Sequence, residues 1–490
     1  MRLCKSILAW VMSSVLVATA ATAQTPAVGP KKEEAARAEA LRLVDVWLDS
    51  VQAYQRLPAL SAAIVQDDKI VWSKGYGKLD VAHKIPATAQ TLYSICSISK
   101  LFTSVALMQL WEAGQVRLDE PFVTYLPWAT LRPLERDSVP ITLRAMLSHS
   151  AGLPRESDFP YWTAPDYPFP TRDEIKARIT EQTPLWPASR WYQYSNLGLT
   201  LVGETISAVS GESYADYVQH HVLDPLHLKD THPFMPMSLY GKRLAVGWSA
   251  ETREGTRELV RPFDARGVAP AAGYVSTVED LGRFAAWQFR LLRTEAPEVL
   301  RASTLREMQR VQFADPAWKV TRGLGFGVSR RGEQTYVGHG GDCPGYHSVL
   351  SLRPATGTAV TAILTGAEHP APLAASVFEL LDKRKNWSFK DPLPADVDLE
   401  AYVGRYSSQP FNAETAIMPW AGGLAVLSLP TVDPAGDLLV LKPKGDDVFR
   451  VLRLDGSEAD EVRFERDKSG RVIRFVQFSN FSKRLGPLAQ

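Results

Sequence analysis

A Ser-x-x-Lys pair at the start of an apolar helical segment is the feature that most constrains this chain. Ser97 and Lys100 form the pair, and small or apolar residues follow it with a helical period as far as Trp111. This spacing places both side chains on one face of a helix. A serine hydroxyl needs a base within hydrogen-bond reach, and a lysine whose pKa is lowered by desolvation can be that base. The pair therefore indicates nucleophilic catalysis, although a serine near a helix N-terminus is more often only a cap.

The composition is that of an ordinary globular protein. The chain has 490 residues, of which 45% are hydrophobic and 22% are charged, with a formal net charge of +1. No block of like charge suggests a basic arm or an acidic tail, so nucleic acid is not an expected partner. The length allows roughly two to four domains.

The N-terminus has the pattern of a secretory signal. A short basic region, residues 1–5, precedes an apolar stretch over residues 7–20, which is too short for a typical membrane span. A small-x-small site ends at Ala23. We therefore expect residues 1–23 to be a signal peptide, and the mature chain to be periplasmic or secreted with no membrane span. An uncleaved N-terminal anchor is the alternative.

No metal or cofactor is expected from the sequence. The chain has no Cys-x-x-Cys and no His-Glu-x-x-His pattern. His220, His221 and His227 lie close together in the sequence, but Pro225 would interrupt a helix that carried a shared ligand face. Solvated or packed histidines explain this cluster better than metal ligands do.

The hydrophobic pattern predicts an α+β fold, with helices flanking an antiparallel sheet beside an all-helical region. A β-hairpin is expected over residues 61–73, around Asp67–Lys69. Helices are expected at 34–51, from Ser97 onward, and at 142–148, 197–209, 275–292 and 373–383. Further strands are expected at 325–329, 334–338, 347–352 and 359–364.

A change of pattern near residue 386 predicts a second, smaller domain. Residues 386–397 contain two prolines and read as a linker. Beyond them, short strands alternate with turn residues. The six expected strands are 402–406, 424–429, 438–441, 449–452, 461–464 and 472–478. This spacing is typical of a small all-β barrel or sandwich, placed at 398–490.

Tyr194 and Asn196 form a Tyr-x-Asn motif just before an expected glycine-containing helix. A phenol near the Ser-Lys pair can move a proton between nucleophile and leaving group. An asparagine amide can bind both the lysine and a substrate amide. Taken alone, a surface turn before a helix is the more ordinary explanation.

A third motif, His339-Gly340-Gly341, is expected where a strand ends. Paired glycines let a substrate approach the backbone closely, and the N–H groups that follow can bind an oxyanion. A glycine bulge in a strand is the alternative for the glycines. His339 by itself is as consistent with a hydrogen-bonded polar residue as with a participant in the chemistry.

Ser-x-x-Lys, Tyr-x-Asn and His-x-Gly in this order resemble the penicillin-recognising serine hydrolases. The resemblance is greatest to the branch that contains class C β-lactamases, DD-peptidases, D-aminopeptidases and related esterases. Residues 141–154 and 272–281 resemble other segments of that branch, and the resemblance covers about residues 40–385. It implies a β-lactamase/DD-peptidase-like domain over 24–385. Some members also carry a C-terminal β-barrel, which fits a lipocalin-like domain at 398–490.

The resemblance implies a role for each motif residue. Ser97 would be the acylated nucleophile and Lys100 its general base. Tyr194 would share proton transfer and help to activate the deacylating water. Asn196 would position Lys100 and the substrate. The oxyanion hole would use the backbone N–H groups of Ser97 and Asp342, each worth about 3 kcal/mol toward the transition state.

His339 stands where many members of the family carry a lysine, while Gly340 and Gly341 complete the motif beside the substrate. A lysine there can attract a β-lactam or peptide carboxylate, whereas a histidine is mostly neutral near pH 7. We therefore expect an exported serine hydrolase that cleaves an amide or ester in a small molecule or short peptide, peptidase- or esterase-like. A β-lactamase or a slowly deacylating penicillin-binding or sensor protein is the alternative.

Two features remain open at this stage. The barrel would either cover the cleft or build a homo-oligomer, and a carbohydrate- or lipid-binding role led by the barrel is a third, weaker hypothesis. The implied fold brings Cys96 and Cys343 near one site, and an exported protein permits a disulfide. Two free buried cysteines are nevertheless the commoner state, and we expect these thiols to be unbonded.

Overall fold

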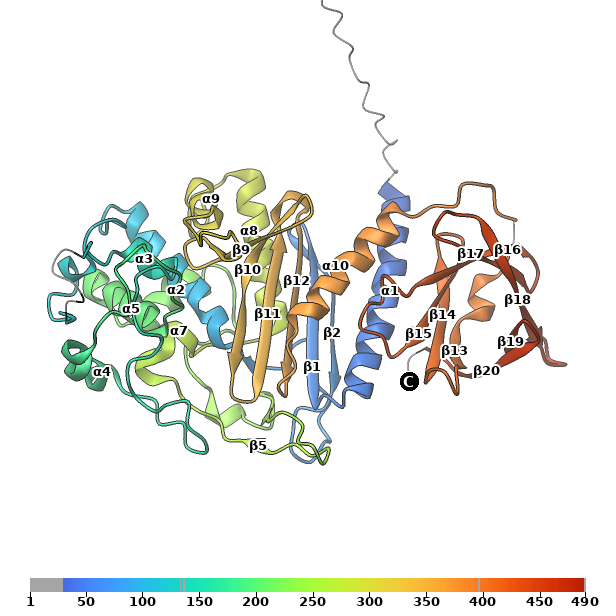
Figure 1. Ribbon diagram of the computed structural model, residues 1–490, viewed down its shortest axis with the longest axis horizontal. Helices are drawn as coiled ribbons and strands as arrows, with labels where there is room; N and C mark the ends of the chain where they lie inside the picture. The colour runs from blue at the N-terminus through green and yellow to red at the C-terminus, as the bar shows by residue number, and fades with distance from the viewer. Residues whose placement is uncertain (1–29, 133, 135–137, 395–396, 489–490) are drawn as a thin grey trace, which may run out of the picture.

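The computed structural model describes residues 30–132, 134, 138–394 and 397–488 (Figure 1). The expected signal peptide, residues 1–23, lies outside the described residues. The described chain has an α+β body, as the hydrophobic pattern predicted, followed by a closed β-barrel, which decides between the barrel and the sandwich that the pattern left open. No helix in the described part of the chain is both long and apolar enough to span a bilayer.

An eight-stranded antiparallel sheet forms the centre of the body. Its strands, in spatial order, are β2 (Lys69–Gly77), β1 (Ala59–Gln66), β12 (Thr358–Thr365), β11 (Tyr346–Arg353), β10 (Gln334–Cys343), β9 (Gly327–Arg331), β8 (Thr321–Arg322) and β7 (Phe313–Ala314). All the strands expected for this region are present. The short strands β7 and β8 were not predicted, because two residues are too few to show a period.

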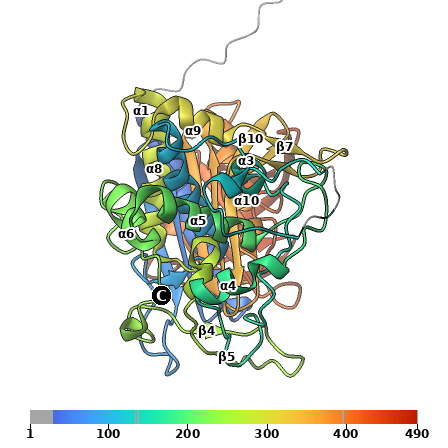
Figure 2. The ribbon, with the colours of Figure 1, turned by 90° about the vertical axis from the view of Figure 1, so that its left-hand side faces the viewer.

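Helices cover both faces of the sheet. On one face lie α1 (Pro30–Tyr54) and α10 (Ala371–Asn386), and on the other lies α8 (Val278–Thr294), which contacts β1, β2 and β12. The helical region stands in front of the sheet in Figure 2. Its helices are α2 (Ser99–Glu112), α3 (Leu143–Leu147), α4 (Arg172–Arg178), α5 (Asn196–Ser210), α6 (Tyr214–Val218), α7 (Ala269–Ala272) and α9 (Ala302–Gln309). Two small sheets pair β3 (Tyr93–Ser94) with β6 (Val275–Ser276), and β4 (Gly247–Trp248) with β5 (Leu259–Val260).

The limits of α5 are set by its own sequence. Ser195 is the N-cap, since its hydroxyl accepts a hydrogen bond from the Gly198 N–H at 2.9 Å. The helix ends at Gly211, whose φ of 78° is a left-handed conformation that glycine adopts without strain. These signals make Asn196 the first residue of the helix, at the end that points toward α2.

The third-motif strand is longer than expected. The sequence indicated a strand over 334–338 that ended before His339, but β10 continues to Cys343 because β11 pairs with it as far as Cys343↔Tyr346. Its other neighbour, β9, pairs only up to Gly338↔Gly327. The end of β10 therefore has one free edge, and β10 contacts the turn that carries Ser97.

The C-terminal strands close into a barrel. They are β13 (Gly404–Ser407), β14 (Glu414–Trp420), β15 (Gly423–Leu429), β16 (Leu439–Gly445), β17 (Val448–Leu452), β18 (Glu458–Arg466), β19 (Val472–Gln477) and β20 (Asn480–Gly486). The six predicted strands are present, and β14 and β20 were missed. Nearly every residue of β14 is buried, so the strand lacks alternation, while β20 is largely polar and half-exposed.

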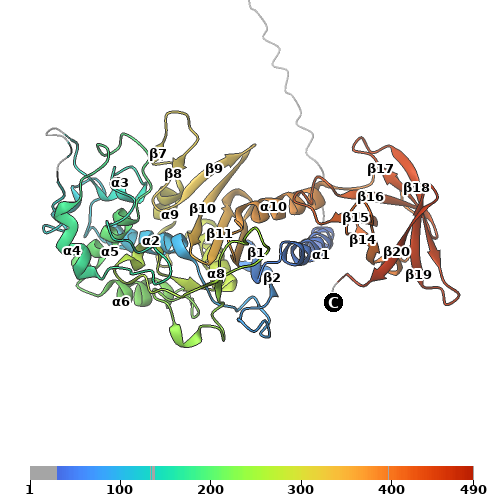
Figure 3. The ribbon, with the colours of Figure 1, turned by 60° about the horizontal axis from the view of Figure 1, so that its bottom comes forward.

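The barrel shares a hydrophobic core with the body. Helix α1 lies between the sheet and the barrel, as Figure 3 shows. Leu43 and Trp47 on α1 belong to one buried cluster with Met418 and Trp420 on β14. The Trp47 indole also donates a hydrogen bond to the Thr431 carbonyl at 3.0 Å. Between α10 and the barrel, the described part of segment 386–397 carries no strand and ends just before a 3₁₀ turn at Leu399–Tyr402.

Candidate active site

Ser97 lies in a short 3₁₀ turn, Cys96–Ile98, immediately before α2. Its neighbours Cys96 and Ile98 are fully buried, whereas Ser97 is half-buried and so can meet a substrate. Cys96 has a φ of 50°, which is uncommon for a residue with a side chain and is held by the surrounding structure. Ser99 helps to hold this backbone conformation, because its hydroxyl donates a hydrogen bond to the Cys96 carbonyl at 2.5 Å.

The Lys100 amino group is buried and surrounded by oxygens. Its Nζ lies 3.1 Å from Ser97 Oγ, 2.8 Å from Asn196 Oδ1 and 2.7 Å from the Ala271 carbonyl oxygen. Burial holds the pKa of Lys100 well below that of an ordinary lysine, because the charged form loses its hydration. A neutral amine has two N–H donors and one lone pair. Asn196 and Ala271 can take the donors, which leaves the lone pair for the Ser97 hydroxyl.

Tyr194 lies over the same amino group, with its ring centroid 4.8 Å from Lys100 Nζ. Burial raises the pKa of Tyr194 far above that of an ordinary tyrosine, and the nearby Ser97 hydroxyl acts in the opposite direction. The side chain is thus a neutral phenol that can donate or relay a proton. His149 packs against it with ring centroids 4.3 Å apart.

Glu156 fixes the orientation of the Asn196 amide. Asn196 Nδ2 donates to both carboxylate oxygens of Glu156 at 3.0 Å, while Oδ1 accepts from Lys100. Only this orientation of the amide satisfies a donor on one side and a carboxylate on the other. The Tyr161 hydroxyl donates a further hydrogen bond to Glu156. Tyr161 belongs to the aromatic segment that follows Glu156.

His339 is close to Tyr194, with ring centroids 6.2 Å apart. Its Nδ1 is 2.5 Å from the Gly340 carbonyl oxygen, so this nitrogen carries the hydrogen and Nε2 is the acceptor of the neutral ring. Burial, with a smaller contribution from the positive charge of Arg322, lowers the pKa of His339 to about 3. The side chain at this third-motif position is therefore uncharged at neutral pH.

Gly341 and Ser348 bring the end of β10 against the Ser97 turn. A Cβ at Gly341 would collide with the Ile95 carbonyl and with the Ser348 hydroxyl, so only glycine fits this approach. Ser348 on β11 donates to the same Ile95 carbonyl at 2.9 Å. At Gly340, by contrast, the nearest atom to an added Cβ is the Ser348 carbonyl oxygen at 3.6 Å.

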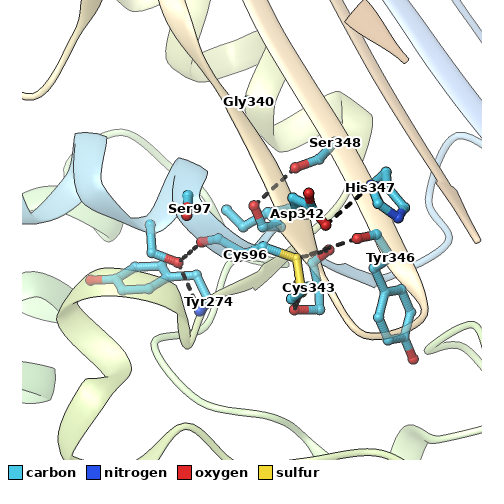
Figure 4. The surroundings of a disulfide bond; sticks show 12 residues. Cys96, Ser97, Tyr274, Gly340, Asp342, Cys343, Tyr346, His347 and Ser348 are labelled. Carbon is cyan, nitrogen blue, oxygen red and sulfur yellow. Dashed lines mark hydrogen bonds and ion pairs between the residues drawn. A yellow bond between two sulfur atoms is a disulfide. The ribbon is translucent and has the colours of Figure 1, made fainter. Parts of the chain in front are cut away.

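A disulfide joins the two walls of the site. Cys96, one residue before Ser97, is bonded to Cys343, one residue after Asp342, with their Cα atoms 5.8 Å apart (Figure 4). The expectation of two free thiols is therefore wrong. It rested on the general frequency of free buried cysteines, and the sequence did not reveal that β10 extends to the turn before α2.

Three residues near the site were missed by sequence reasoning. Glu156 and His149 lack a motif of their own, although His149 lies within segment 141–154, which resembles the family, and Glu156 follows it by two residues. No motif or pattern in the sequence pointed to Arg322, which lies on β8. Its positive charge acts on Lys100, His149 and His339, and it donates a hydrogen bond to the Tyr192 hydroxyl at 2.6 Å. Its Nε has no hydrogen-bond partner within the described residues.

The other singled-out histidines lie elsewhere. His221 is 2.9 Å and His220 is 3.7 Å from Glu212, and both side chains are exposed. They form an ordinary surface ion pair when protonated, and they lie in a π-helical turn, Gln219–Leu223.

Comparison with known proteins places the chain in a family. The Beta-lactamase family model matches residues 44–382, which is more than half of the chain. The chain belongs to the beta-lactamase family. A human beta-lactamase-like protein 1 is 29% identical over 363 residues, which cover 70% of this chain and 68% of the human protein. The chain matches less than half of the length of the next two curated relatives.

Solved structures of this beta-lactamase fold agree with the architecture. An octameric penicillin-binding protein homologue from Pyrococcus abyssi is 21% identical with a TM-score of 0.62, covering 90% of this chain and 99% of that one. A D-amino acid amidase from Ochrobactrum anthropi SV3, complexed with L-phenylalanine, is 24% identical with a TM-score of 0.57, covering 71% and 97%. At these identities the likeness shows the fold.

Replacement of Gly341 by alanine is expected to lower kcat/KM by about 100-fold, because β10 must move away from the Ser97 turn. The matched Gly340→Ala variant should lose much less, since its added Cβ meets only ordinary van der Waals contact. Steady-state hydrolysis and thermal unfolding of both variants check this. If kcat/KM falls equally in both variants, the two glycines are instead needed to let a substrate approach the backbone closely.

Proposed function

We propose that this protein is a serine hydrolase that cleaves an amide or ester bond through an acyl-enzyme on Ser97. The observation that carries the proposal is the buried Lys100 amino group, held by two fixed oxygens with its third direction toward the Ser97 hydroxyl. A solvent-accessible serine beside a neutral, desolvated amine is the arrangement that nucleophilic catalysis needs. A capping serine would need no such partner.

The chemical steps follow from these positions. Lys100 takes the proton of Ser97 as Oγ attacks the substrate carbonyl, and the backbone N–H groups of Ser97 and Asp342 bind the oxygen that becomes negative. Tyr194, a neutral phenol with a raised pKa, passes its proton to the leaving group and takes up the proton that Lys100 received from Ser97, so both side chains are neutral again after acylation. In the second half, Tyr194 and Lys100 remove a proton from the water that attacks the acyl-enzyme. Asn196 positions Lys100 and the substrate relative to each other.

The charge around the cleft favours a substrate that carries an anionic group. His339 is neutral, so the third motif supplies no cation. Arg322 provides a positive charge nearby instead, whereas the guanidinium of Arg155 is paired with Glu156 at 3.1 Å. A short peptide or amide with a free carboxylate fits this field better than a neutral ester does. The D-amino acid amidase among the structural neighbours supports an amide as the scissile group, but it does not bear on a free carboxylate.

The place of action and the assembly are part of the same proposal. Export through a cleaved signal at residues 1–23 fits the Cys96–Cys343 disulfide, since disulfides persist in oxidising compartments. The hydrolase unit is placed at 24–385, the linker at 386–397 and the barrel at 398–490. A homo-oligomer built through the barrel is proposed by analogy with the octameric homologue.

Ser97→Ala is expected to lower turnover by at least about 10⁴-fold, because the nucleophile is lost while the fold remains. The measurement is a panel of D-alanine amides, short p-nitrophenyl esters and nitrocefin, run with both proteins. Full turnover by Ser97→Ala would contradict the proposal. A mass increase after β-lactam addition that persists without product would identify a slowly deacylating penicillin-binding protein, and rapid nitrocefin hydrolysis would identify a β-lactamase.

The acid limb of the kcat/KM profile is expected to follow the protonation of Lys100. Its pKa in the folded protein is lowered, so the active neutral amine is present at pH values well below the ordinary lysine pKa of about 10.4. Activity falls as the pH drops through the lowered value, because protonation removes the base. The profile of His339→Gln is the control. His339→Gln should lose activity over the same pH range as the wild type. If the loss at low pH disappears in this variant, the titrating group is the imidazole of His339.

Arg322→Gln is expected to raise KM by about 10-fold for a substrate with a free carboxylate, through loss of a charged hydrogen bond. KM for the corresponding amide or methyl ester should change little. Arg330→Gln is the matched control, since Arg330 is exposed on β9 and pairs with Glu333 at 3.0 Å. Equal effects on charged and uncharged substrates would contradict a carboxylate-binding role.

A further inference from the structure

Two histidines and an aspartate meet at the end of the β10–β11 hairpin. One potential ligand atom from each of Asp342, His347 and His369 lies within 4.8 Å of the others. Asp342 and His347 are directly paired across the hairpin, so their side chains project from the same face of the sheet. His369 comes from the segment between β12 and α10, and its ring lies 4.9 Å from the His347 ring at a near-perpendicular angle of 86°.

His347 is the buried member of this cluster. Its residue surface is only 6% exposed, and its Nδ1 has no hydrogen-bond partner among the described residues. Its Nδ1 lies 3.5 Å from Asp342 Oδ1, which is an ion-pair separation longer than an ordinary hydrogen bond (Figure 4). A buried ring nitrogen is normally partnered, and this one has a carboxylate oxygen at 3.5 Å, while a second imidazole ring lies 4.9 Å from its own ring.

We propose that Asp342, His347 and His369 bind a divalent transition metal ion, with Zn²⁺ the ion that fits this donor set best. Zn²⁺ bonds to nitrogen and oxygen ligands are about 2.1 Å long, so tetrahedral ligand atoms are about 3.4 Å apart. The His347–Asp342 separation of 3.5 Å already matches that spacing. Asp342 and His369 are exposed, and their side chains can rotate to close the wider separations.

The donor chemistry selects among metals. Two imidazole nitrogens and one carboxylate suit Zn²⁺ and its neighbours, whereas Mg²⁺ and Ca²⁺ prefer oxygen ligands alone. Glu368 is not available as a fourth ligand, because its carboxylate is held by Arg257 at 2.6 Å. Three protein ligands leave one coordination position for water.

The site lies beside the proposed oxyanion hole without being part of it. Successive residues of a strand point to opposite faces, so the Asp342 side chain projects away from the face that carries Cys343 and the disulfide. The metal would hold the side chain of Asp342. The backbone N–H of the same residue is the proposed oxyanion donor. An effect of Zn²⁺ on hydrolysis rests on the proposed function, whereas metal binding itself does not.

The test uses the untagged, full-length protein after treatment with a chelator. Equilibrium dialysis against Zn²⁺ alone, followed by elemental analysis, gives the number of bound ions and their affinity. The visible absorption of bound Co²⁺ reports its coordination. We expect one tight Zn²⁺ per chain, and at least a tenfold loss of affinity in both His369→Gln and Asp342→Asn. These two variants carry the test, because His347→Gln alters a buried residue.

His221→Gln is the matched control, since it removes an exposed histidine that lies near a carboxylate elsewhere on the surface. It should bind Zn²⁺ like the wild type. Ser97→Ala should also keep the metal, which separates a failure of the hydrolase proposal from a failure of the metal proposal. The inference is overturned if the wild type binds no Zn²⁺, or if His369→Gln and Asp342→Asn bind it with unchanged affinity.

Discussion

The burial of one amino group is the constraint on which the rest of this structure depends. Lys100 can lie in a dry interior only if its N–H groups find acceptors and its charge is given up. The acceptors come from the first residue of α5 and from α7, and the lone pair meets the turn before α2. Three separate pieces of the helical region must therefore pack correctly before Ser97 has its proposed base. Folding and the proposed catalytic arrangement thus depend on the same contacts.

A second constraint acts between the helical region and the sheet. The Ser97 turn is attached to the β10–β11 hairpin by the Cys96–Cys343 disulfide, by the Ser348–Ile95 hydrogen bond and by the close approach at Gly341. These three links surround the two backbone N–H groups proposed to bind the oxyanion. The spacing of those donors is thus controlled by covalent and steric contacts rather than by flexible side chains, as preorganised electrostatic stabilisation requires.

The sequence predicted those parts of the protein whose structure depends on residues close together in the chain. The Ser-x-x-Lys turn, the helix at 197–209 and the alternating strands of the sheet depend on neighbours in the chain, and they were found. Glu156 and Arg322 act on residues that are far away in sequence, so no local pattern marks them. The disulfide and the Asp342–His347–His369 cluster depend on how far β10 extends, and pairing with β11 decides that length. Strand β14 was missed because burial on both faces removes its alternation.

Helix α1 has one side against the sheet and the other against the barrel, although the barrel strands come last in the chain. As the polypeptide is made, Leu43 and Trp47 have no apolar cover on the barrel side until β14 has been made, some 370 residues later. The body of the protein thus lacks this part of its cover until β14 has been made. This long-range contact leaves an aggregation-prone apolar face exposed in the meantime, and it makes the barrel an integral cover for helix α1.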